Sequence, residues 1–238
     1  MSLPAALRTS AAHVFVDDLD APELDERDAH HLRRVLRLRD GEAVTISDGR
    51  GAWRPARWCA GAAVVDGDVV EQPPERGVCI AAAIPKGERL EWMVQKLAEV
   101  GVGSIVLVDC DRSVVRWSAE RATTHVARLR RVAREAAMQS RRTWLPAVAG
   151  PTPFADVAGT AGAVLADPAG PPVDARRAGT GTVIVGPEGG FTEREMAVAP
   201  SVSLGDHVLR IETAALVAAV LVRPLDTRTE QRSTQREN

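Results

Sequence analysis

The first third of the chain alternates short apolar runs with polar turns. Asp48-Gly49 and Asp66-Gly67 are turn signals that separate such runs. The predicted strands lie at residues 13–16, 43–47, 53–59 and 62–65, and one helix is expected at residues 26–35. Several short strands within so few residues favour a small β-barrel.

Beyond residue 77 the pattern changes to strands that alternate with helices. The predicted strands are residues 78–83, 104–109, 162–166, 182–185, 202–204 and 208–211, and the predicted helices are residues 90–100, 120–143 and 214–222. This alternation favours the α/β class, with a mostly parallel sheet covered by helices. A polar, proline-containing stretch at residues 71–77 has no apolar period and is interpreted as a linker.

Length and composition bound the organisation. A chain of 238 residues can hold two domains with separate cores. We place a small domain at residues 1–72, a larger one at 77–225 and a disordered polar tail at 226–238. The longest apolar run, 214–222, is too short to cross a bilayer, and no secretory pattern begins the chain, so we expect a cytoplasmic protein without a membrane partner. No ligand cluster accompanies His30-His31, so no metal is expected.

The most informative motif follows the predicted strand 182–185. Gly186-Pro-Glu-Gly-Gly190 forms an open turn, and Thr192-Glu-Arg-Glu195 has the pattern of a capping box at the start of a helix. Glycines let a ligand approach the main chain, and the carboxyl end of a strand is where α/β sheets place ligands. The turn therefore predicts a small-molecule site built from backbone, although an ordinary strand-turn-helix corner is the simpler alternative.

A second segment repeats the arrangement. Ser203-Leu-Gly205 ends one predicted strand, and Glu212-Thr213 opens an apolar helix. Neither segment matches a Gly-x-x-x-x-Gly-Lys-Ser/Thr phosphate loop, and the stretch from Gly179 lacks the third glycine of a dinucleotide fingerprint. A nucleoside triphosphate is therefore disfavoured as the ligand.

Taken in order along the chain, these segments resemble one protein family. The turn Gly186 to Phe191 and the stretch Ser203 to Ala214 are similar to segments of the 16S ribosomal RNA uracil-N3 methyltransferases of the SPOUT superfamily. Three further segments match in the same order: His30 to Arg37, Pro85 to Lys96 and Glu135 to Arg142. Five motifs in the same order are much harder to produce by chance than a single glycine turn.

The resemblance implies a fold, a cofactor and a reaction. It implies a PUA-like barrel followed by a SPOUT domain with a deep trefoil knot, a homodimer, and transfer of methyl from S-adenosylmethionine to N3 of a uridine in 16S rRNA or the small ribosomal subunit. Carried over by motif, the cofactor-binding residues are Ala166, Gly186, Pro187, Glu188, Gly189, Gly190, Leu204, Gly205, Val208, Leu209, Thr213 and Ala214. Backbone N–H and C=O groups there suit the adenine, the ribose hydroxyls and the carboxylate of that cofactor.

The reaction requires loss of the N3 proton of uracil. Arg142 and Arg210 are candidates to stabilise the developing negative charge, and Glu188 is a candidate proton acceptor. Glu212 and His207 are alternatives for that proton, and Glu212 has an equally good interpretation as a cap of the following helix. The family commonly has arginine where this chain has His207.

Charge is segregated along the chain despite a net charge of -2. From Arg112 to Arg142 there are nine arginines and two acidic residues, and the projected 120–143 helix gathers arginines on one face. We predict that this face contacts RNA phosphates, with a merely solvated face as the alternative. The predicted RNA-binding residues are Arg33, Arg34, Arg37, Arg128, Arg131, Arg134, Gln139 and Arg142. One or two arginines of the small domain could instead pair with the acids at 17–28.

Two other functions stay open. A non-catalytic RNA-binding or ribosome-assembly protein would keep the basic surfaces without the cofactor. A methyltransferase with a different acceptor would share the cofactor. The intact glycine turn and the Glu212-Thr-Ala214 segment favour catalysis over the first.

Overall fold

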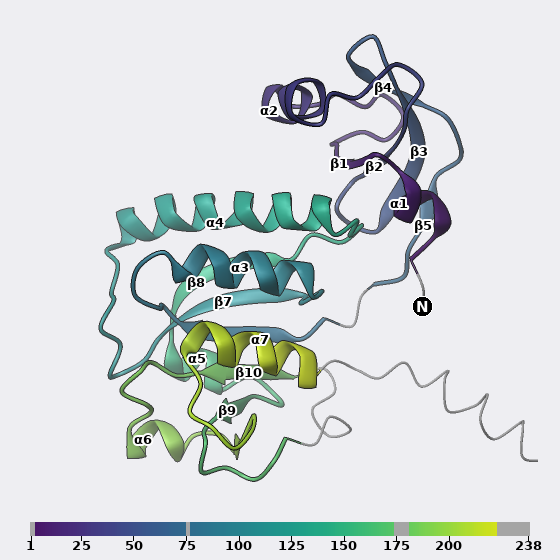
Figure 1. Ribbon diagram of the computed structural model, residues 1–238. Helices are drawn as coiled ribbons and strands as arrows, with labels where there is room; N and C mark the ends of the chain where they lie inside the picture. The colour runs from purple at the N-terminus through teal and green to yellow at the C-terminus, as the bar shows by residue number, and fades with distance from the viewer. Residues whose placement is uncertain (1–2, 75–76, 174–180, 223–238) are drawn as a thin grey trace, which may run out of the picture.

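The computed structural model describes residues 3–74, 77–173 and 181–222, and its N-terminal part is a five-stranded sheet (Figure 1). The elements there are α1 (Ala5–Thr9), β1 (Ala12–Phe15), α2 (Glu26–His30), the π-helical turn η1 (His31–Val35), β2 (Ala43–Ser47), β3 (Ala52–Cys59), β4 (Ala62–Val65) and β5 (Val70–Glu71). The strand order is β1-β2-β3-β4, and β5 also pairs with β3. β1 runs parallel to β2, and the other pairs are antiparallel. The predicted strands are thus confirmed to within a residue or so, whereas α1 and β5 were not predicted.

The core of this sheet is formed by side chains that alternate along the strands. Val44 and Ile46 of β2 and Trp58 of β3 are almost fully buried and pack against Leu32 of η1. The side chain of Asp25 caps α2 by accepting a hydrogen bond from the N–H of Asp28 at 2.7 Å. The helical segment is therefore fixed on the sheet by one apolar anchor and one polar cap.

The C-terminal part is a six-stranded sheet in which every pair of strands is parallel. Its elements are β6 (Cys79–Ala83), α3 (Arg89–Glu99), β7 (Ser104–Asp109), α4 (Ala119–Gln139), β8 (Ala147–Pro153), α5 (Phe154–Ala158), β9 (Val164–Ala166), β10 (Thr182–Val185), α6 (Glu193–Met196), β11 (Ser201–Val202) and α7 (Ile211–Leu221). The order β11-β9-β10-β6-β7-β8 places β10 inside the sheet. The α/β class is confirmed.

Helices cover both faces of this sheet. On one face α3, α4 and α7 lie side by side (Figure 1), and the core there includes Met93, Leu129 and Ala215. The other face is covered by α5 and by Phe191, whose ring packs near that of Phe154 at 5.7 Å. Because both faces of the sheet are buried, the inner strands are continuous apolar runs and do not alternate polar with apolar residues.

The long helix α4 is shorter than predicted. The side chain of Ser118 caps its start by accepting from the N–H of Arg121, and the helix ends at Gln139. Arg141 has φ of 60°, a left-handed conformation that stops the helix. Arg141 and Arg142 therefore lie outside the helical projection, so the prediction of a helix to residue 143 was wrong.

Two other predictions fail at the sheet margin. β8 was missed because Gly150 and Pro151 argue against a strand, yet an edge strand tolerates proline. The predicted strand 208–211 does not form, since β11 has only two residues and the chain leaves the sheet after it; α7 then starts at Ile211, three residues earlier than expected.

The two sheets meet through side chains at the C-terminal end of α4. Arg134 donates to the carboxylate of Asp28 at 2.6 Å and to the carbonyl oxygen of Phe15 at 3.0 Å. His13 lies between the Thr45 hydroxyl and the carbonyl oxygen of Arg142, both 2.9 Å from its ring nitrogens. The boundaries at residues 72 and 77 and the trefoil knot stay predictions, and the predicted tail lies outside the described residues.

Candidate functional site

The glycine turn after β10 has the predicted geometry. Gly190 has φ of 70°, and its N–H donates to the carbonyl oxygen of Pro187 at 2.8 Å. Gly186 lies against the Phe191 ring, because a Cβ added there would be 2.9 Å from a ring carbon. Thr192 and Glu195 form the complete capping box at the start of α6. A short-range motif thus fixes the turn, as the sequence indicated.

A side chain from another loop holds the turn in place. The guanidinium of Arg112, which follows β7, donates to the carbonyl oxygens of Gly189 at 3.0 Å and Phe191 at 3.1 Å. The carboxylate of Glu195 accepts from the N–H of Asp111 at 2.8 Å, while Asp111 pairs with Arg194. The hydrogen bond from Arg194 holds the pKa of Asp111 below its usual range. Sequence reasoning assigned no role to Arg112 or Phe191.

The predicted cofactor segments lie together at one edge of the sheet. Ala166 ends β9, Gly186 follows β10 and Leu204 follows β11. Because these three neighbouring strands are parallel, their carboxyl ends meet at the same edge. Ser203 is fixed to the segment after β9 by hydrogen bonds with Pro171 at 2.7 Å and Val173 at 3.0 Å. The convergence of the loops is therefore a property of the fold.

The loop that follows Gly205 is open. The side chains of residues 206–208 are exposed, and Val208 reaches 86% exposure, whereas Leu209 is half-buried. Within the described ranges, the N–H groups of residues 206–209 have no hydrogen-bond partner. Exposed, unpaired amides beside a glycine turn suit the carboxylate and hydroxyl groups of a small molecule.

The first turn of α7 completes this edge. Thr213 is half-buried and Ala214 is buried. The N-cap position is occupied by Arg210, whose side chain does not cap the helix, so the alternative that Glu212 caps it is wrong. Glu212 lies inside the turn with one carboxylate oxygen 3.6 Å from Arg89, and its other oxygen is buried without a hydrogen-bond partner in the described part of the chain. A buried carboxylate of this kind suits a ligand that carries positive charge.

The three catalytic candidates have different surroundings. Glu188 is exposed in the turn and Arg210 is exposed just before α7, so both lie at the sheet edge where the loops converge. Arg142 is only 7% exposed and donates to the carbonyl oxygen of Ala98 at 3.0 Å. It precedes β8, at the edge where the strands begin, and therefore lies at the opposite end of the sheet from the turn.

The arginines of the basic stretch are mostly engaged within the protein. Arg128 pairs with Glu91 on α3, Arg130 donates to the carbonyl oxygen of Val148, and Arg134 holds Asp28. By contrast, the guanidinium of Arg131 is exposed and contacts no polar group among the described residues. Most of these guanidinium groups are thus held by contacts within the protein, and the prediction that this face contacts RNA phosphates stays a prediction.

The predicted RNA-binding residues of the small domain stay accessible. Arg33, Arg34 and Arg37 are exposed and make no ion pair with any described acidic residue. Their suggested pairing with the acids at 17–28 does not occur, because Asp20 pairs with Arg54 and Asp28 with Arg134. Gln139 is exposed at the end of α4.

Neither a membrane span nor a metal site is found among the described residues. No helix there is both long and apolar enough to cross a membrane. No group of three or more histidine, cysteine, aspartate or glutamate side chains is placed to hold a metal ion in the same residues.

Comparison with known proteins gives the family. The model of an RNA methyltransferase domain matches residues 72–223, and that of an RNA methyltransferase PUA domain matches residues 24–57. The ribosomal RNA small subunit methyltransferase E of Mycobacterium bovis is 34% identical over 86% of this chain and 87% of its own length.

Two solved structures are similar across most of the chain. A probable rRNA-methyltransferase from Porphyromonas gingivalis has a TM-score of 0.76 at 28% identity and covers 92% of this chain and 99% of its own. A putative methyltransferase from Legionella pneumophila, in complex with S-adenosylmethionine, has a TM-score of 0.75 at 25% identity, over 88% of this chain and 96% of its own. The sheet-edge loops, the PUA match and these relatives together show that the chain belongs to the ribosomal RNA small subunit methyltransferase E family.

Proposed function

We propose that this protein methylates small-subunit ribosomal RNA at N3 of a uridine, with S-adenosylmethionine as the methyl donor. The observation that carries the proposal is the meeting of three loops, after β9, β10 and β11, at one sheet edge. The relative from Legionella, of similar fold, binds the same cofactor. A ribosomal RNA substrate supports our further proposal that the protein acts in the cytoplasm.

The residues present fit this cofactor. The backbone of 186–190 and 204–209 would hold the adenosine and the carboxylate, since its amides at 206–209 lack partners within the described chain. Glu212 supplies a buried negative charge beside the loop. When bound, S-adenosylmethionine supplies an electrophilic methyl group on a positively charged sulfur.

The chain's own side chains have two tasks in the reaction. One is to remove the N3 proton of uracil, so that the nitrogen lone pair forms the new N–C bond as the S–C bond breaks. Glu188 is the best placed acceptor, because it is exposed in the turn itself. The other task is to stabilise negative charge on the base, for which Arg210 lies at the same edge. Arg142 lies at the opposite edge of the sheet from the glycine turn of the same chain. It would therefore serve only in the site of a partner subunit.

The test combines a transfer assay with two matched variants. Small ribosomal subunits from cells lacking the gene are incubated with labelled S-adenosylmethionine, and the modified nucleotide is mapped by mass spectrometry. Glu188→Gln should lower kcat by about 100-fold if Glu188 accepts the proton. Glu193→Gln, an exposed neighbour on α6, should not change it.

Other outcomes of this assay decide between the functions. A folded protein that binds small subunits in a salt-sensitive manner, yet gives no calorimetric response to S-adenosylmethionine, would be a non-catalytic RNA-binding protein. Transfer to a different RNA would keep the cofactor and change the acceptor.

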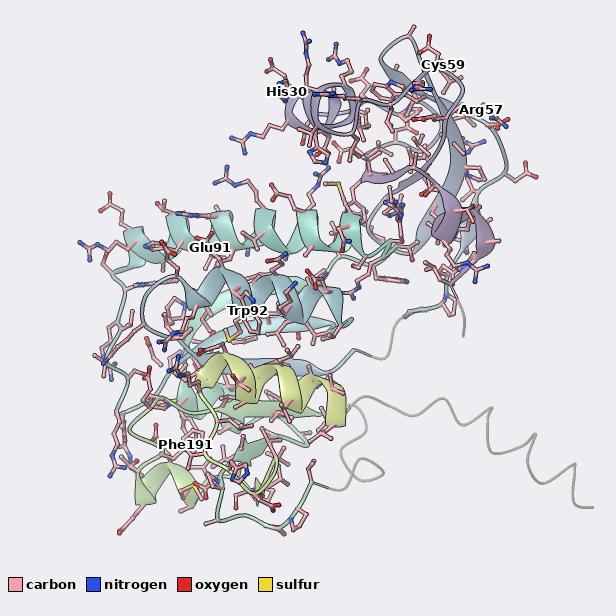
Figure 2. All side chains as sticks on the ribbon, viewed as in Figure 1. His30, Arg57, Cys59, Glu91, Trp92 and Phe191 are labelled. Carbon is pink, nitrogen blue, oxygen red and sulfur yellow. The ribbon has the colours of Figure 1, made fainter. Side chains whose placement is uncertain are left out.

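We further propose a homodimer. Apolar side chains are exposed on the adjacent helices α3 and α7: Trp92 on α3 (Figure 2), and Val220 and Leu221 on α7. Large apolar side chains exposed on two adjacent helices favour burial against a partner. Light scattering should give twice the chain mass, and Trp92→Glu should give the monomer.

A further inference from the structure

A cavity separates the N-terminal sheet from α4, far from the sheet edge described above. Its volume is about 760 Å³, and its walls come from β1, from α2 and η1, and from the C-terminal part of α4. Such a volume is within the range of sites that hold small organic ligands. The cavity has no part in the proposed methyl transfer.

The side chains at this cavity combine apolar walls with a polar rim. Val35 and Leu36 are large apolar residues that are 61% and 45% exposed, and Met138 of α4 also lines the cavity. Glu135 and Gln139 lie four residues apart on α4, hence on one face of the helix, and both are exposed lining residues. A ligand with flat apolar faces and a hydrogen-bonding edge matches this combination.

Several contacts fix the shape of the cavity without a ligand. His13 bridges Thr45 and the carbonyl oxygen of Arg142, and Arg134 holds Asp28. The guanidinium of Arg141 donates to the carbonyl oxygen of Ser10 at 2.9 Å. Each contact joins the α4 region to the N-terminal sheet, so the site is preformed and loses little entropy when it binds.

Acidic side chains line the cavity at Glu26, Asp28 and Glu135, but exposed arginines that could contact phosphates surround it. Arg34 lies on η1 and Arg37 follows it, Arg27 lines the cavity, and Arg131 lies one turn before Glu135 on α4. All four are exposed, and none forms an ion pair within the described ranges. A nucleotide has flat faces, a polar base edge and a phosphate, and it satisfies all three features together.

We propose that this cavity receives one unstacked base of the ribosomal RNA, at a position other than the methylated uridine. Glu135 accepts hydrogen bonds from the donor groups of the base edge, and Gln139 contacts the same edge. Met138, Val35 and Leu36 pack on the base, while Arg34, Arg37 and Arg131 contact flanking phosphates. The proposal rests on the proposed function for the identity of the RNA.

The position of the cavity makes it an anchor for the substrate. α4 has 21 residues and is therefore about 30 Å long. The cavity lies at its C-terminal end, whereas Arg112, which binds the glycine turn, precedes its N-terminal end in the chain. A base bound here cannot reach the methyl donor in the same chain. It would instead set the register of the RNA.

The decisive variant removes an acidic residue, because simple phosphate attraction and base recognition predict opposite changes in RNA affinity. If this surface only attracts phosphates, loss of the Glu135 carboxylate leaves RNA binding unchanged or tighter. If Glu135 reads a base, Glu135→Ala/Gln139→Ala weakens binding by roughly tenfold, the cost of losing hydrogen bonds to a charged group. The measured quantity is the Kd for small ribosomal subunits from cells lacking the gene, at fixed salt.

A matched control uses the same chemistry elsewhere on α4. Glu120→Ala/Thr124→Ala also removes one acid and one polar side chain four residues apart, from exposed positions outside the cavity. It should leave the Kd unchanged or slightly lower. Calorimetry with S-adenosylmethionine should give the same affinity for both double variants as for the original chain, which shows that they are folded.

Ultraviolet crosslinking supplies a second readout. The proposal predicts an RNA crosslink in the peptide that contains Met138 or in the one that contains Leu36. Crosslinks only elsewhere, or a Kd for Glu135→Ala/Gln139→Ala equal to or below that of the control, overturn it while leaving methyl transfer intact. A chain that binds neither small subunits nor S-adenosylmethionine overturns the proposed function as well.

Discussion

The glycine turn and the arginine-rich helix were the two strongest features of the sequence. They differ in how far the folded structure could be predicted from their residues. The turn keeps its sequence-local geometry, with the capping box complete and Gly190 in the left-handed region. The arginines of α4 mostly bind partners distant in sequence, as Arg134 does with Asp28. The conformation of a local motif can thus be predicted from its own residues, whereas the partners of a run of charged residues cannot.

The largest expected effect tests the structural role of an arginine. Arg134→Ala leaves the Asp28 carboxylate, whose side chain is 9% exposed, without its ion pair. We expect the free energy of unfolding in urea to fall by about 3 kcal/mol, as for a broken buried pair. Arg131→Ala, the exposed neighbour, should change it by less than about 0.5 kcal/mol. Equal effects of the two variants would contradict a structural role for Arg134.

The pH dependence of stability tests the same junction. Burial lowers the pKa of His13 from 6.5 to about 4. The unfolded chain therefore takes up this proton first as the pH falls, so stability is full above about pH 6.5 and is lost between 6.5 and 4. The loss should reach about 3 kcal/mol. His13→Gln should be less stable at pH 8 and should show a flatter pH profile; an unchanged profile would exclude His13 as the cause.

A smaller effect is expected at the glycine turn. Gly186→Ala places a methyl group 2.9 Å from the Phe191 ring, so the ring or the turn must move. We expect a loss of about 1 to 2 kcal/mol in stability and weaker binding of S-adenosylmethionine by calorimetry. Adding Phe191→Leu removes the ring and should restore part of the stability. Strictly additive losses would show that the ring does not make glycine necessary there.

The smallest effect concerns Arg131, whose guanidinium has no partner among the described residues. Arg131→Ala should weaken the binding of small ribosomal subunits by a few-fold and reduce the slope of log K against log salt by about one. Stability should not change. Arg128→Ala serves for comparison, because that guanidinium is already paired with Glu91 and should have a smaller effect on the slope. A larger change in slope for Arg128 would reverse this ranking.

Much of the fold could be predicted from apolar periodicity. The strands at 43–47, 62–65, 104–109 and 182–185 have the predicted bounds. The failures have physical causes. β8 carries a Gly-Pro pair that its edge position tolerates, and residues 208–211 have strand-like composition but pair with no strand among the described residues. Edge position and strand pairing both depend on residues far away in the sequence, so a short stretch of sequence cannot predict them.

The features of the site likewise fall into those that could be predicted from nearby residues and those that could not. The conformation of the Gly186–Glu195 corner could be predicted because glycine, proline and the capping box encode it locally, whereas its role in binding the cofactor came from the resemblance and stays a prediction. Arg112 was missed, since a single arginine in a loop carries no sign that it will bind the carbonyl oxygens of Gly189 and Phe191. The cavity was missed because its two walls are about a hundred residues apart in sequence.

The sequence by itself determined the α/β class, the strand-turn-helix corner at Gly186 to Glu195 and the resemblance to a family. Those depend on interactions within a few residues, or on motifs kept in order. The tertiary structure alone decided which arginines have partners among the described residues, where Arg142 lies and that a cavity lies between the N-terminal sheet and α4. Side-chain partners and cavities depend on distances between segments remote in sequence, and those distances exist only once the chain has folded.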